Sequence, residues 1–338
     1  MDQIFGNGPK GLVYVSDSEP GIRRQPSGRG FCYRLPDGAL LRDPDQKNRI
    51  NALAIPPAYR DVWICSDERG HLQATGVDDR SRKQYRYHPE WSEFRNQLKF
   101  AGLAEFGEAL PRIRRRVRAD LRTEAGDLEF TLAAIVALAD AAALRPGSRS
   151  ATSENRTYGA TTLLKRHVKL EDDRIRLDYR AKGGKRVRMS LRQRRLHQIL
   201  EKIADLPGRR LFQWRDENDV LRPVESGQVN AYLADASGGG HSFKTFRTWA
   251  GTLAAFEAGL SSFDNGEKAS IKTMAGASAA VLHNTAAVSR SSYVHPKVFE
   301  LTELSLDEGL EFAAKLKGVL QVSELRIGEA RLLDYLKS

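Results

Sequence analysis

The sequence of 338 residues contains little cysteine and no long apolar segment. Its two cysteines, Cys32 and Cys65, stand outside any Cys-x-x-Cys pair and cannot form a disulfide framework, so we expect two reduced thiols. The longest apolar run, 131–144, contains Asp140 and is shorter than the roughly 20 residues that a membrane span requires. The N-terminal sequence MDQIFGNGPK lacks the apolar segment of a signal peptide. These absences exclude a membrane-spanning protein and favour an intracellular one.

Motifs for nucleotide and metal binding are also missing. No Gly-x-x-x-x-Gly-Lys-Ser/Thr sequence occurs, which excludes a P-loop and gives no reason to expect ATP as a cofactor. The seven histidines are scattered, and no cysteine–histidine group has the spacing of metal ligands. The acidic stretch 171–173 adjoins a basic segment and is typical of a turn rather than of a two-metal site. We therefore expect neither a metal nor an organic cofactor, and any cleavage of nucleic acid must proceed without a metal ion.

Acidic residues are fewer than basic ones. The chain has 43 Asp and Glu against 54 Lys and Arg, which gives a formal net charge of +11. Ten basic residues and a single acid, Asp178, lie between Arg174 and Arg195, and a second basic group occupies 112–122. Because like charges repel unless a partner neutralises them, this excess favours a polyanion. The first group is split by a turn and lacks the apolar stripe of a membrane-surface helix, so we expect nucleic acid rather than a membrane.

The first ninety residues are typical of β structure. Apolar and β-branched runs alternate with turn residues such as Pro36-Asp37-Gly38. The pattern predicts strands at 11–16 and 83–88, a hairpin over 30–43, and a second hairpin formed by 62–67 and 71–76.

Helical periodicity begins after residue 90. Helices are predicted at 91–104, 107–122, 127–144, 191–204, 226–236, 242–259 and 267–283, with a further pair after Asp307. The helix 127–144 is apolar nearly all round and should be buried. A β-hairpin insert is predicted over 167–191, with its turn at Lys182-Gly183-Gly184-Lys185. The fold class is therefore α+β, with a small β-rich N-terminal domain (1–90) and a larger, mainly helical domain (91–338).

An aromatic and basic strand precedes the expected domain boundary. Alternation along the strand places Tyr85 and Tyr87 on one face, away from Gln84. Paired tyrosines are commonly half-buried packing residues, but here the neighbouring Arg82 and Lys83 add positive charge. We interpret these five residues as candidate contacts to nucleic acid.

The C-terminal half carries groups suited to phosphoryl transfer without a metal. Such chemistry requires a nucleophile, cations for the non-bridging oxygens and a proton donor for the leaving oxygen. Arg145 ends the buried helix before a Pro-Gly turn, and Lys182 stands at the tip of the basic hairpin. Lys244 and Arg247 are three residues apart and hence on one helix face. The set is completed after a later helix end by an amide and a tyrosine, Asn284 and Tyr293.

In this order and local context, the set resembles the active site of the type IB DNA topoisomerases in their small poxvirus-like and bacterial form. FKTFRT around Arg247 and SRSSY ending at Tyr293 carry the resemblance, which covers most of the chain. The strand KQYRYH (83–88) is similar to the segment with which the N-terminal domain of that family contacts DNA. The resemblance implies a two-lobed clamp on duplex DNA and a catalytic domain with the fold of the tyrosine recombinases.

The resemblance also implies a role for each residue. Tyr293 would attack a DNA phosphodiester, form a 3′-phosphotyrosyl link and release a 5′-hydroxyl. Religation would need no ATP, because the covalent link retains the energy of the broken bond. Arg145 and Arg247 would hold the non-bridging oxygens, and Lys182 would protonate the leaving oxygen. Lys244 is a candidate for positioning a DNA phosphate.

Asn284 departs from the family pattern. Many members carry histidine at this position, nine residues before Tyr293. Asparagine can donate a hydrogen bond to a phosphate oxygen but cannot titrate, so we expect no histidine titration to limit the rate near pH 6–7. The adjacent His283 is expected to pack or to cap a helix rather than to replace it.

Each candidate also has an ordinary structural alternative. Arg145 could serve only as a helix C-terminal residue and Lys182 only as a turn residue. Arg247 could form a salt bridge in the core, and Tyr293 could be a packing residue. Two other tyrosines are then alternative nucleophiles: Tyr179 and Tyr232.

Two other classes of protein compete with a topoisomerase. A tyrosine recombinase or integrase usually has His-x-x-Arg where this chain has Lys244-x-x-Arg247, and its N-terminal domain is usually helical. A non-catalytic DNA-binding protein would explain the basic clusters but not the order of the candidate catalytic residues. We therefore expect a monomeric type IB topoisomerase, cytoplasmic and associated with the nucleoid, that acts on duplex DNA without a nucleotide cofactor.

Overall fold

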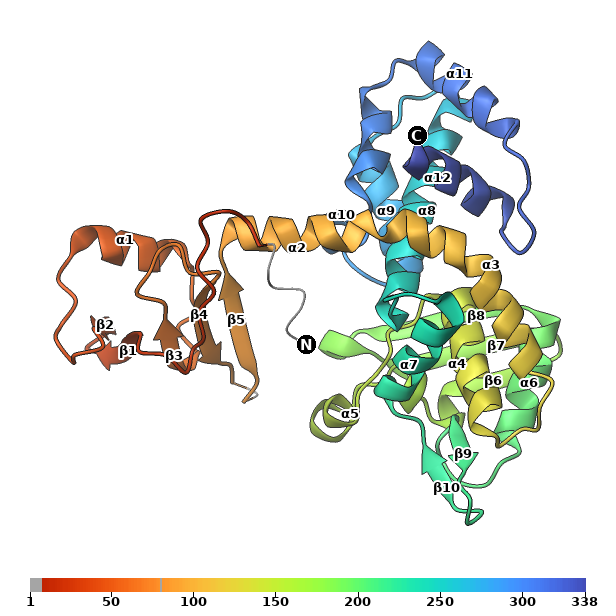
Figure 1. Ribbon diagram of the computed structural model, residues 1–338, viewed down its shortest axis with the longest axis horizontal. Coiled ribbons are helices and arrows are strands. Elements are labelled where there is room, and N and C mark those ends of the chain that lie inside the picture. Colours follow the sequence, from red (N-terminus) through yellow and green to blue (C-terminus); the bar gives the residue numbers. More distant parts are fainter. Residues whose placement is uncertain (1–7, 80) are drawn as a thin grey trace. The chain divides into compact units, whose positions relative to one another are not determined.

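A computed structural model describes residues 8–79 and 81–338, which belong to two compact units. The first unit ends at Ala101 and the second begins at Gly102 (Figure 1). The boundary predicted at residue 90 falls near the start of helix α2 (Pro89–Ala101). In the structure α2 belongs to the first unit, because Trp91 packs edge-on against His71 with ring centroids 4.8 Å apart.

The first unit is built on a five-stranded antiparallel sheet of order β2-β1-β3-β4-β5. Its strands are β1 (Ile22–Ser27), β2 (Gly30–Arg34), β3 (Arg60–Ile64), β4 (Leu72–Val77) and β5 (Lys83–Tyr87). Helix α1 (Pro44–Ala52) covers one face, where Ile50 is buried with Ile22 and Ile64. On the other face Trp63, one residue before Ile64, is buried with Leu72.

The sequence predicts this sheet only in part. The hairpin of 62–67 and 71–76 is confirmed as β3–β4, and the strand at 83–88 is confirmed as β5. The strand at 11–16 is wrong, since the segment forms a single isolated bridge between Val13 and Gly70. The hairpin over 30–43 is shorter than expected, because beyond β2 it has only the bridge from Arg34 to Leu40. The main partner of β2 is β1, which is polar and contains Pro26, so its composition does not indicate a strand.

The second unit is mainly helical, and its fold class together with the first unit is α+β, as predicted. Its longer helices are α3 (Leu103–Asp120), α4 (Leu128–Ala142), α6 (Arg194–Ala204), α7 (Ser226–Ser237), α8 (Phe243–Asp264), α9 (Ile271–Leu282), α11 (Leu306–Lys317) and α12 (Ile327–Lys337). Short helices are α5 (Arg149–Asn155), α10 (Ala286–Ser292), η2 (Ala160–Thr162), η3 (Lys165–His167), η4 (Lys182–Gly184) and η5 (Pro296–Glu303). The short α5 and α10 have too few residues to show a helical period, and the sequence did not predict them.

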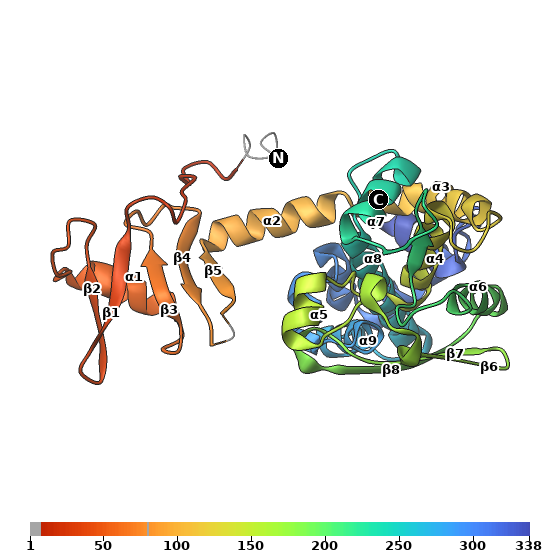
Figure 2. The same ribbon diagram turned by 90° about the horizontal axis from the view of Figure 1, so that it is seen from below.

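The predicted β insert is a three-stranded antiparallel sheet of order β6-β7-β8. Its strands are β6 (Val168–Glu171), β7 (Arg174–Arg180) and β8 (Arg186–Arg192), and Figure 2 shows them along one edge of the second unit. The inward residues of β7 are Ile175, Leu177 and Tyr179, which leaves its arginines outside. A further hairpin, β9 (Gln213–Arg215) and β10 (Leu221–Pro223), was not predicted.

Helix α4 lies at the centre of the second unit, as its composition predicts. Phe130, Ala134 and Leu138 are fully buried along it. Because α4 is packed on all sides, its position in the core is fixed. The loop that follows α4 therefore starts from a fixed point. None of the helices in the described part of the chain combines the length and the apolar character that crossing a bilayer requires.

A buried ionic cluster joins α3, α4, α8 and α12. Arg114 donates to Asp140 at 2.9 Å and to Glu329 at 2.7 Å, and the Glu329 side chain is fully buried. The indole of Trp249 also donates to Glu329, at 3.3 Å. The basic group at 112–122 is thus neutralised in part by carboxylates of the same unit.

Replacing Arg114 by methionine should lower the free energy of unfolding by up to about 3–5 kcal/mol, because the fully buried Glu329 would lose its closest cation and keep only Arg326, at 3.2 Å. Urea unfolding followed by tryptophan fluorescence measures this change. Arg115→Met removes an exposed arginine from the same helix and should change stability by less than about 0.5 kcal/mol. Equal losses in the two variants would contradict the assignment of the cluster as a structural support.

Candidate active site

The loop after α4 holds Arg145 in a fixed position. Helix α4 ends with Ala143 in a left-handed conformation (φ 47°), which turns the chain out of the helix. The carbonyl of Arg145 accepts a hydrogen bond from the N–H of Ala160 at 2.8 Å. Gly159 makes this approach possible, because a Cβ there would lie 2.6 Å from the Arg145 carbonyl oxygen. The predicted place of Arg145, just beyond the buried helix, is therefore confirmed.

Arg247 lies in the first turns of α8 and is almost fully buried, with 3% of its surface exposed. Its guanidinium donates to the carbonyl of Ala143 and, at 3.0 Å, to the carbonyl of Leu282. These carbonyls lie at the C-terminal ends of α4 and α9, where oxygens lack intrahelical partners and the helix dipole is negative. Arg247 makes no ion pair with a carboxylate in the described part of the chain, so the alternative of a core salt bridge is wrong.

Tyr293 is positioned by the end of α10 and by α8. It is the C-cap residue of α10, and its N–H donates to Ser289 at 2.9 Å. Its carbonyl accepts from Oγ1 of Thr252 at 3.2 Å. Gly251 allows the backbone of Tyr293 to pack closely against α8, because a Cβ at residue 251 would lie only 3.0 Å from the Tyr293 carbonyl oxygen. One helix therefore supplies Arg247 and, one turn later, the support for the tyrosine.

Four of the predicted residues meet around the Tyr293 side chain. Arg145 donates to the Tyr293 hydroxyl at 3.3 Å and to Oδ1 of Asn284 at 2.6 Å. The guanidinium carbon of Arg247 lies 5.1 Å from the centre of the Tyr293 ring. The phenol is thus flanked by two cations and an amide that come from three separate segments of the chain.

Two donors at this place have no hydrogen-bond partner. Nε of Arg247 and Nδ2 of Asn284 are buried, and neither finds an acceptor within the described protein. Buried donors are nearly always satisfied in proteins, so unpaired ones indicate an absent partner. A partner rich in acceptor oxygens and negatively charged fits both donors and the uncompensated charge of Arg247.

The surrounding charges alter the acidity of the tyrosine. Burial on its own would raise the pKa of Tyr293, but the charges of Arg247 and Arg145, together with hydrogen bonds from both, outweigh it. The net result is a pKa below the usual value for tyrosine. The arrangement favours the phenolate, which is the nucleophilic form.

Lys182 lies on the wall of a small recess beside this group. The recess is also lined by Arg145, Arg247 and Tyr179. Lys182 itself is exposed, in the turn between β7 and β8, where Gly183 and Gly184 both have φ of +77°. The structure therefore brings the predicted lysine to the same place as both arginines.

The two alternative tyrosines have different surroundings. Burial raises the pKa of Tyr179 to about 12, although Arg247 and Arg145 act against it. Burial and then a hydrogen bond to Asp120 raise the pKa of Tyr232, and that bond is 2.7 Å long. Of these three tyrosines, Tyr293 alone has a lowered pKa.

Lys244, a predicted DNA contact, and His283, which lines the same recess as Arg145 and Arg247, make no hydrogen bond to the phenol in the described part of the chain. Lys244 is exposed on the first turn of α8, whereas Arg247 one turn later is buried. His283 is the left-handed C-cap residue of α9, which confirms its prediction as a capping residue. Burial, and next the charge of Arg247, lower the pKa of His283.

The N-terminal candidates lie in the first unit, where several have partners. Arg82 pairs with Asp78 at 2.6 Å, Gln84 donates to Asp78 at 3.0 Å, and Lys83 pairs with Asp17. The remaining two candidates are Tyr85 and Tyr87, whose rings stack with their centroids 6.1 Å apart. Tyr85 is 49% exposed and Tyr87 is 44% exposed. The predicted alternation of this strand is confirmed, and the stacked pair offers an exposed aromatic face.

Some residues that build the site are not predictable from the sequence pattern. Thr252, which anchors the Tyr293 backbone, carries no signal in sequence other than its place one turn after Arg247. Tyr179 was considered only as a nucleophile, but its alternation with Leu177 on β7 indicates an inward side chain on the recess wall. In the described chain, no three His, Cys, Asp or Glu side chains lie close enough together to hold a metal ion.

Replacing Arg145 by leucine should raise the pKa of Tyr293, because the variant loses a cation and a hydrogen bond that favour the phenolate. Absorbance titration at alkaline pH measures this change, with the Tyr293→Phe variant subtracted to isolate one phenol. Arg115→Leu, an exposed change on α3, should leave the difference curve unmoved. An unchanged midpoint in Arg145→Leu would argue against electrostatic control of this tyrosine.

Comparisons with known proteins identify the family. A family described as "Bacterial DNA topoisomerase IB, N-terminal domain" matches residues 30–78, and one described as "Eukaryotic DNA topoisomerase I, catalytic core" matches residues 88–309. A protein of Acanthamoeba polyphaga mimivirus named DNA topoisomerase 1B is 30% identical over 292 residues, which cover 83% of this chain and 87% of that protein. The chain therefore belongs to the type IB DNA topoisomerase family, and it is an isomerase that acts on duplex DNA.

Proposed function

We propose that this enzyme relaxes supercoiled duplex DNA by cutting one strand with Tyr293, allowing rotation and resealing the strand. The observation that carries the proposal is the phenol of Tyr293 held between Arg145 and Arg247 with a lowered pKa. The Tyr293 oxygen forms a bond to a backbone phosphorus while the bond from phosphorus to the 5′ oxygen breaks. The products are a 3′-phosphotyrosyl link and a 5′-hydroxyl strand end.

The arginines stabilise the negative charge that develops on the phosphate. In the free protein Arg145 is bonded to the Tyr293 hydroxyl and to Asn284, and Arg247 is bonded to backbone carbonyls and to Tyr293, so neither is paired with a carboxylate. Both charges are therefore available to the two non-bridging oxygens, and Nε of Arg247 and Nδ2 of Asn284 are donors still to be satisfied. Asn284 contributes a neutral hydrogen bond, which would not titrate near pH 6–7.

Protons must move in both directions during cleavage. The Tyr293 proton passes to water, a transfer assisted by the cations that lower its pKa. Lys182 gives a proton to the 5′ oxygen as it leaves, and it takes the proton back when that hydroxyl attacks in religation. Lysine suits this task because its ammonium can lose a proton, whereas arginine stays charged.

The mechanism needs neither ATP nor a metal ion. The phosphotyrosyl bond replaces the phosphodiester, so its energy is retained for religation. Guanidinium groups at fixed positions supply the charge stabilisation that a metal would otherwise provide. Between the two steps, torque in the DNA turns the free 5′ end about the intact strand.

A basic surface next to the recess is proposed to follow the DNA backbone. A depression of about 450 Å³ is lined by Tyr179, which also lines the recess, and by four arginines: Arg156, Arg166, Arg180 and Arg186. Asp178 also lines it and pairs with Arg186, so the lining keeps an excess of positive charge. Phosphate contacts of this kind position a protein on DNA without reading sequence. Affinity should consequently fall steeply as salt increases.

We further propose that the N-terminal region, residues 1–90, forms the second half of a monomeric clamp on DNA. The exposed stack of Tyr85 and Tyr87 is its best candidate contact, because aromatic faces can pack against the DNA. Arg82, Lys83 and Gln84 would join only by sharing or exchanging their present acidic partners. The remainder, residues 91–338, would form a catalytic domain related in fold to the tyrosine recombinases.

Relaxation of negatively supercoiled plasmid in EDTA and without ATP tests the proposal. The wild type should relax the plasmid and leave a covalent protein–DNA adduct in denaturing gels, whereas Tyr293→Phe should do neither because it lacks the attacking oxygen. Tyr179→Phe is the matched control and should still form the adduct. Relaxation by Tyr293→Phe would assign the nucleophile to another residue.

A modified substrate tests the role of Lys182. Lys182→Ala should slow cleavage of ordinary DNA by about 100-fold or more, in line with the usual size of general-acid catalysis. A substrate with sulfur in place of the 5′ bridging oxygen should restore most of the rate, because a thiolate leaves without prior protonation. Arg247→Ala should stay slow on both substrates, since its defect concerns the non-bridging oxygens. Failure of the sulfur substrate to rescue Lys182→Ala would exclude this lysine as the acid.

A further inference from the structure

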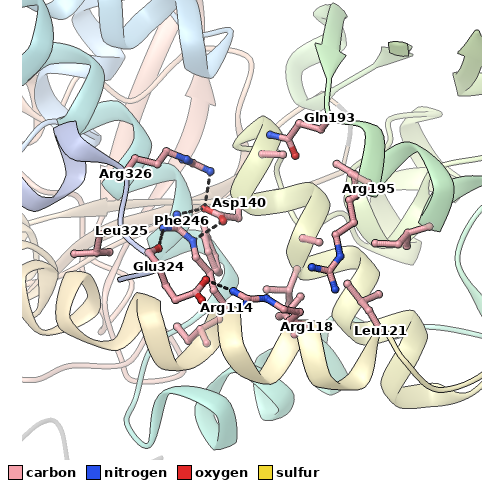
Figure 3. A pocket seen from close by; sticks show the side chains of 17 residues that line it. Arg114, Arg118, Leu121, Asp140, Gln193, Arg195, Phe246, Glu324, Leu325 and Arg326 are labelled. Carbon is pink, nitrogen blue, oxygen red and sulfur yellow. Dashed lines mark hydrogen bonds and ion pairs between the residues drawn. The ribbon is translucent and has the colours of Figure 1, made fainter. Parts of the chain in front are cut away.

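A cavity of about 480 Å³ opens in the second unit at a place that the proposed chemistry does not use (Figure 3). Its walls come from α3, α4, α6 and α8, and from the segment that precedes α12. The volume lies within the range of about 300–1,000 Å³ typical of sites for small molecules. Phe246, which adjoins Arg247, and Ala141, near the end of α4, both line it.

Apolar side chains make up the larger part of the cavity lining. Its floor is formed by aliphatic side chains of three helices together with one aromatic ring: Ile113, Val117, Val136, Leu196, Ile199 and Phe246. A ligand that fills this floor must present a hydrophobic body, because a polar one would lose its hydration without gaining partners.

The rim carries four arginines, three of which are neutralised within the protein. Arg114 pairs with Asp140 and Glu329, Arg118 pairs with Glu324, and Arg326 pairs with Asp140 and Glu329. These three cations are already matched by acidic partners. The remaining one is Arg195.

Arg195 forms no ion pair with any carboxylate among residues 8–79 and 81–338. It lies in the first turn of α6, where the helix dipole disfavours a cation. Because Arg195 is exposed, water solvates its charge, and an anion beside it would offset the unfavourable interaction with the helix dipole. Figure 3 shows its side chain extended along the cavity wall toward Leu121.

We propose that this cavity binds a small amphipathic monoanion, an apolar or aromatic body with one carboxylate or sulfonate that pairs with Arg195. One unmatched arginine calls for one negative charge, and the apolar floor calls for the hydrophobic body. A ligand seated here contacts α4 and α8, the helices that position Arg145 and Arg247. The competing occupant is a DNA phosphate on Arg195, but a phosphodiester has no apolar body for the floor.

Fluorescence titration of the full-length enzyme with 8-anilinonaphthalene-1-sulfonate tests the proposal. The probe should bind saturably at one site per chain. Arg195→Gln should weaken this binding at least about tenfold, the usual value of a charged hydrogen bond. Ala137→Trp should abolish it by filling the cavity, since Ala137 lies on its wall. Arg194→Gln, an exposed neighbour outside the cavity, is the matched control and should bind as the wild type does.

Competition then tests the charge of the ligand. 2-Naphthoate should displace the probe, whereas neutral 2-naphthalenemethanol should need at least about tenfold more. Wild-type affinity in Arg195→Gln, or equal displacement by the acid and the alcohol, would overturn the proposal. So would loss of probe binding in Arg194→Gln equal to that in Arg195→Gln, which would indicate general attraction of anions to a DNA-binding surface. If Ala137→Trp does not fold, the exposed Arg195→Gln still decides the question.

Discussion

The organisation of the site depends on how the charge of Arg247 is compensated. The side chain is buried, yet it is held by backbone carbonyls at the ends of α4 and α9 instead of by a carboxylate. Carbonyl dipoles satisfy the donors of a guanidinium without cancelling its charge. The same contacts fix the ends of α4 and α9 relative to α8. Arg247 therefore also positions the loops that follow these two helices, which carry Arg145 and Asn284. Elsewhere in this unit, arginines such as Arg114 are paired with acids and lose their influence on an anion.

The sequence predicted a set of residues that the structure brings together, but it did not predict how they are held. The order of Arg145, Lys182, Arg247, Asn284 and Tyr293 is a linear pattern, and the family comparisons agree with the class of enzyme that it indicates, rather than with a recombinase or a non-catalytic binding protein. The carbonyl partners of Arg247 could not be predicted, because every residue has a carbonyl and only the packed helices decide which ones converge.

The rest of the fold shows the same division. The buried helix α4 and the basic hairpin were predictable, since their periodicities are strong. Strand β1 was not, because a polar segment is drawn into the sheet by its neighbours and not by its own composition. The number of basic residues at 112–122 also overestimates how many cations are available to a polyanion. Acids that are distant in sequence, such as Glu329, lie beside them in the fold. Arg195 shows the opposite, a cation that folding leaves without an acid.

The buried setting of Arg247 separates two kinds of electrostatics in the molecule. In ordinary buffers mobile ions largely screen interactions between exposed charges that are more than about 10 Å apart, but they do not enter a packed interior. Under the proposed mechanism, ionic strength therefore governs how long the enzyme stays on DNA, while the equilibrium between cut and sealed strand changes little. Salt becomes a control of processivity: at low salt one enzyme molecule removes many turns before it departs, and at high salt it works distributively with the same chemistry at each encounter.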